Sequence, residues 1–104
     1  MSKFYTLQML LAQIGCEQTF HQRLTLAETG YLAGEYELWI SDRDNDVVCC
    51  LRGERYEPAI RLDADEFIEL AADVKTPEEL EAAIGAAVAI RAAILQEKGV
   101  HVEE

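Results

Sequence analysis

The chain has 104 residues, of which 20 are acidic and nine are basic, so its formal net charge at pH 7 is -11. This length suits one globular domain with a single core, and no linker or repeat divides residues 1–104. An acidic balance of this size disfavours direct binding to nucleic acid, because Lys and Arg supply most of that affinity. We therefore expect protein partners, basic ones above all, and no direct contact with nucleic acid.

No signal-peptide pattern is evident near Met1, which predicts a cytoplasmic location. The most apolar stretch, residues 82–95, is shorter than the ~20 residues that span a bilayer. It predicts a buried helix and no membrane contact.

The first predicted element is a helix over residues 2–14. Ser2 can cap its start, and Gly15 is placed to end it. The apolar residues that recur at spacings of three and four are Phe4, Leu7, Leu11 and Ile14.

Residues 16–34 have a weaker pattern. Phe20 and Leu24 stand four apart, and Thr25 with Glu28 fits a capping box, which favours a short second helix followed by a loop. Residues 10–24 can also be aligned with a helix-turn-helix that has Gly15 in its turn, but Arg23 would be the one base on its reading helix. That composition disfavours DNA binding.

Between residues 35 and 62 the apolar period becomes two. The polar run at residues 42–46 separates this alternating segment from a continuous apolar run at residues 47–51, as in a hairpin. A third strand follows Gly53, and Pro58 is best tolerated there if that strand lies at an edge. The residues that carry the pattern are Tyr36, Leu38, Ile40, Val47, Leu51, Tyr56, Ile60 and Leu62. We expect a three-stranded antiparallel meander.

Two helices are predicted after the strands. Asp63 with Glu66, and Thr76 with Glu79, each fit a capping box. The second of these helices begins at Pro77 and ends at Lys98, with Gly99 just past its end. The predicted fold is therefore α+β, in the order α-(α)-β-β-β-α-α, with the helices packed on the sheet.

The last helix is apolar almost all round, so it needs cover on two sides. Leu80, Ile84, Val88, Ile94 and Leu95 can cover the sheet, while small residues such as Ala86 and Ala89 permit close approach of another helix. The N-terminal helix can supply that second cover. A second copy of the chain can supply it instead, which makes a homodimer through residues 77–98 a hypothesis.

Acidic residues concentrate between Asp63 and Glu81. This stretch contains eight of them, and Lys75 is its single base. Carboxylates arrayed on helices can replace the phosphates of nucleic acid in the site of a basic protein. The predicted partner-binding carboxylates are Asp65, Glu66, Glu69, Asp73, Glu78 and Glu79.

Trp39 is the other predicted partner-binding residue. The strand alternation places it opposite Leu38 and Ile40, on the face shared with Glu37. If the helices cover one face of the sheet, Trp39 is partly exposed and can anchor a partner. If the N-terminal helix covers that second face, Trp39 is a core residue.

Catalytic and metal-binding patterns fail on inspection. Asp42, Asp44 and Asp46 have the spacing that opens a calcium loop, but Val47 stands where Gly is required and Gly53 where Glu is required. We expect a solvated turn, in which Asn45 would tolerate a left-handed conformation.

The cysteines, Cys16, Cys49 and Cys50, fit neither a disulfide framework nor a zinc site. Cys49 and Cys50 are expected to pack on either side of the sheet. No cofactor, metal or catalytic residue is predicted.

These observations predict a non-enzymatic interaction protein, an inhibitor or adaptor whose acidic helix docks on a basic, nucleic-acid-handling protein. Nucleic-acid mimics and anti-CRISPR inhibitors act in this way. One alternative is a dimeric acidic chaperone or adaptor that binds an apolar segment of a client. Another is a small-ligand module or enzyme with a site that the sequence does not reveal.

Overall fold

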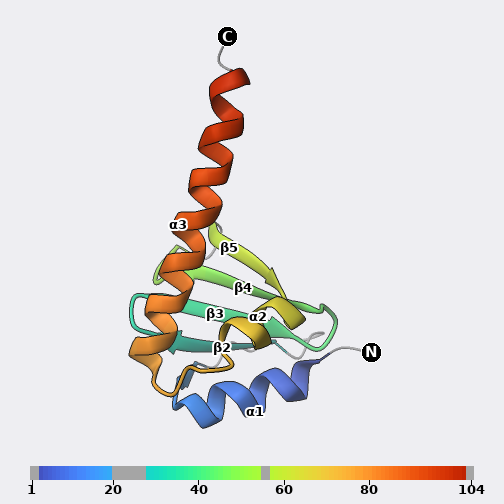
Figure 1. The fold of residues 1–104 in the computed structure, drawn as a ribbon. Coiled ribbons are helices and arrows are strands. Elements are labelled where there is room, and N and C mark those ends of the chain that lie inside the picture. The colour runs from blue at the N-terminus through green and yellow to red at the C-terminus, as the bar shows by residue number, and fades with distance from the viewer. Residues whose placement is uncertain (1–2, 20–27, 55–56, 103–104) are drawn as a thin grey trace.

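The computed structural model describes residues 3–19, 28–54 and 57–102 of the chain, with side chains through residue 96. Within these ranges, five antiparallel strands form one sheet in which each strand pairs with its neighbours in the sequence. The strands are β1 Glu17–Thr19, β2 Glu28–Ala33, β3 Tyr36–Ser41, β4 Asp46–Leu51 and β5 Pro58–Asp63. The helices are α1 Phe4–Ile14, α2 Ala64–Leu70 and α3 Pro77–Val102, and all three lie on the same face of the sheet (Figure 1).

The prediction of a three-stranded meander is wrong, because β1 and β2 extend the sheet to five strands. The three predicted strands correspond to β3, β4 and β5, and β5 is an edge strand that begins at Pro58. A helix and loop were expected where β1 and β2 lie. The part of that expectation that rests on Phe20, Leu24 and Thr25 falls outside the described residues.

Gly30 explains why the sequence pattern did not predict β2. A glycine in a strand lacks a side chain to pack and is usually unfavourable there. Here a Cβ atom at Gly30 would lie 2.3 Å from Thr19 Oγ1 and 3.0 Å from the ring of Trp39, its partner across the β2–β3 pair. Side chains from the two neighbouring strands therefore fill the space that Gly30 leaves.

The core lies between the sheet and the helices. α1 buries the four apolar residues that its spacing predicted. From the strands, Tyr31, Leu38, Val47 and Cys49 join the same core, and Phe67 of α2 is fully buried in it. Gly15 ends α1 in a left-handed conformation with φ 95°, as expected, whereas the N-cap residue is Lys3 and its side chain makes no capping bond.

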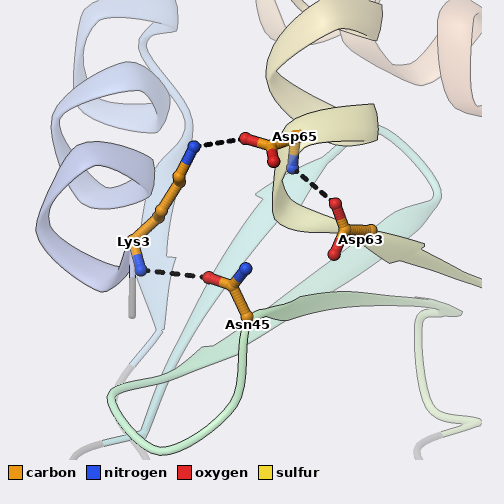
Figure 2. Close-up of polar contacts among 4 residues, drawn as sticks. All are labelled: Lys3, Asn45, Asp63 and Asp65. Carbon is orange, nitrogen blue, oxygen red and sulfur yellow. Dashed lines mark hydrogen bonds and ion pairs between the residues drawn. The ribbon is translucent and has the colours of Figure 1, made fainter. Parts of the chain in front are cut away.

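α2 begins with the predicted capping box. The Asp63 side chain accepts a hydrogen bond from the Asp65 N–H at 3.0 Å, and Glu66 Oε1 accepts one from the Asp63 N–H at 3.0 Å. Figure 2 shows how this helix start is joined to the N-terminus: the Lys3 N–H donates to Asn45 Oδ1 at 3.2 Å, and Lys3 Nζ pairs with Asp65. The Asn45 side chain thus joins the segment before α1 to the turn between β3 and β4. The turn does not use the left-handed conformation that Asn45 would tolerate, since no described residue other than glycine has a positive φ.

α3 also begins as predicted, at Pro77, with Thr76 Oγ1 accepting from the Glu79 N–H at 3.1 Å. Glu79 Oε1 accepts from the Lys75 N–H at 2.7 Å. The helix then continues through Gly99 to Val102. Its predicted end at Lys98 is therefore wrong.

The prediction that residues 82–95 form a buried helix is also wrong. Leu80 and Ile84 are fully buried over the sheet, but every side chain from residue 89 to residue 96 is exposed. Figure 1 shows the reason, because the second half of α3 extends past β5 into solvent. None of the helices over the described ranges is both long and apolar enough to cross a membrane.

Candidate interaction surfaces

Six exposed carboxylates belong to α2, the following loop and the start of α3, and are here called the acidic surface. Its members are Asp65, Glu66, Glu69, Asp73, Glu78 and Glu79, all exposed to solvent. The amphipathic pattern of α2 causes this exposure. Phe67 and Ala71 turn into the core, and the acidic positions between and around them are left outside.

Half of the acidic surface serves the fold itself. Asp65 pairs with Lys3, Glu66 completes the capping box of α2, and Glu79 accepts from the Lys75 N–H at the start of α3. Acidic side chains in the first turn of a helix also interact favourably with its dipole. These three positions therefore have a structural reason to be acidic.

Glu69, Asp73 and Glu78 differ from the other three. Within the described part of the chain they form no hydrogen bond or ion pair through their side chains, although they are exposed. Glu78 lies in the first turn of α3, where the helix dipole favours a carboxylate, but no described side chain or N–H group pairs with Glu69, Asp73 or Glu78. They are the members of the acidic surface that remain available to a partner.

Trp39 lies on the sheet face opposite the helices, which we call the helix-free face. It pairs with Gly30 of β2 and Val48 of β4 and is partly exposed. α1 packs its apolar side chains into the core on the other face, so it does not cover Trp39. The sequence left open whether Trp39 is partly exposed or a core residue, and in the structure its side chain is partly exposed.

A shallow hollow lies beside Trp39. Its volume is about 40 Å³, and Trp39 and Val48 line its apolar side. Glu28, Asp44 and Asp46 line its polar side, and Asp46 Oδ2 lies 3.6 Å from the guanidinium of Arg61. The hollow is smaller than most small-molecule sites, and its carboxylates favour a cationic group.

The projecting segment, residues 89–102 of α3, is the surface that sequence reasoning missed. Its large apolar side chains are exposed, with exposed fractions of 63% for Ile90, 48% for Ile94 and 62% for Leu95. Helix length gives the signal that could have found it. Twenty-six residues make a helix of about 39 Å, whereas six-residue strands are about 20 Å long and five strands about 24 Å wide. A sheet of that size leaves much of α3 uncovered.

All three cysteines are buried, and none of them forms a disulfide. Cys49 lies in the core, and Cys50, also buried, stands outside that core cluster, as expected for neighbouring residues of β4. Burial raises the pKa of the Cys49 thiol to about 12. Burial, with a smaller effect of the Glu78 carboxylate, raises that of Cys16 to about 11. Neither thiol is suited to act as a nucleophile, which requires the thiolate.

Asp42, Asp44 and Asp46 lie on or beside the β3–β4 turn, as predicted. Within the described ranges, His, Cys, Asp and Glu residues form no group of three or more that could hold a metal ion. His21 lies outside those ranges.

Similarity to known proteins gives no guide to what these surfaces do. No protein-family model, no curated protein and no solved structure matches the chain. Function is therefore argued from the surfaces themselves.

Proposed function

We propose that this chain is a non-enzymatic interaction protein of the cytoplasm, an inhibitor or adaptor whose acidic surface docks on a basic, nucleic-acid-handling protein. One observation carries the proposal: Glu69, Asp73 and Glu78 are exposed carboxylates without an internal partner in the described structure. They belong to two helices and the loop between them, so they offer negative charge over an area rather than at a point. A basic site that binds the phosphates of nucleic acid can bind these carboxylates in their place.

The electrostatics of this surface favour fast and selective association. A cluster of like charges attracts an oppositely charged partner over several ångströms and repels nucleic acid. At physiological ionic strength the Debye length is about 8 Å, so added salt weakens this attraction strongly. An acidic-surface complex should therefore dissociate at moderate salt.

The test is a pull-down from host lysate with stepwise salt elution, performed with three versions of the chain. The first is the native chain, and the second carries Glu69→Lys, Asp73→Lys and Glu78→Lys. The third carries the same change in net charge elsewhere, through Glu17→Lys, Glu54→Lys and Glu57→Lys, all at exposed positions.

We expect the native chain and the third version to capture a basic protein that elutes at moderate salt. The second version should not capture it. Equal capture by all three versions would contradict the proposal, because the acidic surface would then be irrelevant. The absence of any basic protein would contradict it as well.

The helix-free face favours a second candidate function, an adaptor or chaperone that binds an apolar segment of a client. Trp39 and Val48 are partly exposed there, next to the hollow, and no described helix covers them. In this case Trp39→Ala should abolish capture of a salt-resistant partner, while the triple substitution at Glu69, Asp73 and Glu78 should leave it unchanged. The opposite pattern favours the acidic surface.

A further inference from the structure

α3 exposes a row of residues four positions apart, of which the last two lie in the projecting segment: Ala82, Ala86, Ile90 and Ile94. Residues with this spacing form one ridge on a helix, and ridges of this kind pack against one another when two helices meet. The row contains two small residues followed by two large ones. All four are exposed, so no described part of this chain covers the ridge.

We infer that this ridge is a homodimer interface, in which two copies of α3 pack antiparallel around a two-fold axis near residue 88. In that arrangement Ile90 of one copy lies opposite Ala86 of the other, and Ile94 lies opposite Ala82. Each large side chain meets a small one, and the symmetry repeats each contact. The ridge is thus complementary to itself in size.

Charge also favours a second copy as the occupant. Between residues 82 and 96 the single formal charge is Arg91, in a chain whose net charge is -11. Two copies can approach here with the least repulsion. A basic partner, in contrast, would find no carboxylate on this stretch.

The inference does not rest on the proposed function, because the ridge contains none of the carboxylates of the acidic surface. In the antiparallel pair Ile94 of one copy lies opposite Ala82 of the other, which is four residues, or about 6 Å along the helix, from Glu78. The substitutions that test the pairing leave the acidic surface unchanged, so the two proposals are tested separately.

The size of the contact sets the expected strength. Helix overlap from Ala82 to Ile94 is about 18 Å long, and a helix is about 10 Å across. This footprint is smaller than the ~800 Å² that each partner buries in a standard stable interface. We therefore expect a reversible dimer with a Kd in the micromolar range, which forms as concentration rises.

Sedimentation equilibrium of the full chain tests the inference. At about 100 µM we expect a mass twice that of the 11.7 kDa chain. Ile90→Glu with Ile94→Glu should weaken association about 100-fold or more, because it places four charges in the apolar contact. Both side chains lie outside the core, so the variant should keep its fold, which circular dichroism will show.

A matched control comes from α1. Tyr5 and Met9 are also four residues apart and exposed, at 75% and 65%. Tyr5→Glu with Met9→Glu makes the same charge change on another helix and should leave the dimer mass unchanged. A monomeric native chain at about 100 µM, or equal loss of the dimer in both double variants, would overturn the inference.

Cross-linking tests the antiparallel arrangement. The native cysteines are buried, so cysteines introduced on the ridge would be the accessible thiols of the described structure. A chain with Ala82→Cys and Ile94→Cys should be joined to its copy by a short bis-maleimide. Ile94→Cys alone should not be joined, because its copies would lie about 18 Å apart. Efficient linking of the single variant would refute the antiparallel pairing.

Discussion

Gly34 makes a tight contact that joins the sheet to α3. It has φ 60°, in the two-residue turn between β2 and β3, where a glycine at the first position is favoured. The carboxylate of Glu81, from α3, lies against it and accepts a hydrogen bond from the Glu35 N–H at 2.8 Å. A Cβ atom at Gly34 would lie 2.1 Å from Glu81 Cδ. Gly34→Ala should therefore destabilise the protein in two separate ways.

The expected loss can be worked out from these two effects. The left-handed backbone costs an alanine about 1 kcal/mol more than a glycine. Displacing the Glu81 carboxylate loses a hydrogen bond at a partly exposed site, worth about another 1 kcal/mol. The sum of about 2 kcal/mol corresponds to a fall in Tm of about 10 °C for a domain of this size.

Gly53 provides the matched control. It also has a positive φ, 87°, but a Cβ atom there would meet nothing within 4 Å. Gly53→Ala should therefore cost only the backbone effect, about 1 kcal/mol or a fall in Tm of about 5 °C. Thermal unfolding followed by circular dichroism measures both variants.

A double-mutant cycle with Glu81→Ala separates the two effects. In that background Gly34→Ala should cost only about 1 kcal/mol, because the carboxylate that it displaces is gone. If Gly34→Ala costs as much with Glu81→Ala as without it, or no more than Gly53→Ala, the contact between Gly34 and Glu81 is not the source of the loss. The reasoning would then be refuted.

Three further predictions concern the core, a helix cap and the thiols. Phe67→Ala should lower the free energy of unfolding by about 3–5 kcal/mol in urea titrations, because Phe67 is fully buried; a loss below 1 kcal/mol would contradict this. Asp63→Ala removes the acceptor for the Asp65 N–H and should cost about 1 kcal/mol by the same measurement, whereas an unchanged midpoint would show that the cap is dispensable. Folding raises the pKa of Cys16 and Cys49, so the folded state keeps protons that the unfolded state loses; stability should fall as pH rises from about 9 to about 12, less so in Cys49→Ala.

Local patterns predicted the elements that depend on local interactions. The spacing of Phe4, Leu7, Leu11 and Ile14 gave α1, and Gly15 marked its end correctly. The capping box of Asp63 and Glu66 located the start of α2 to the residue. These signals are reliable because they arise within one or two turns of the chain.

β2 was missed because its stability comes from neighbouring strands. Gly30 is unfavourable in a strand on its own, and only the side chains of Thr19 and Trp39, from two other strands, fill the space around it. A local pattern contains no information about such neighbours. The same limit applies to Trp39, whose partial exposure depends on which face the helices cover.

The sequence by itself determined the acidic charge, the helix caps, the alternation of β3 and the apolar run of β4, since each of these follows from residues close together in the chain. The tertiary structure decided the rest: that three helices share one face, that Glu69, Asp73 and Glu78 have no internal partner in the described structure, and that α3 extends beyond the sheet. An apolar sequence predicts burial, but burial requires a surface to pack against. For Ile90 and Ile94 the described sheet ends too early to provide it.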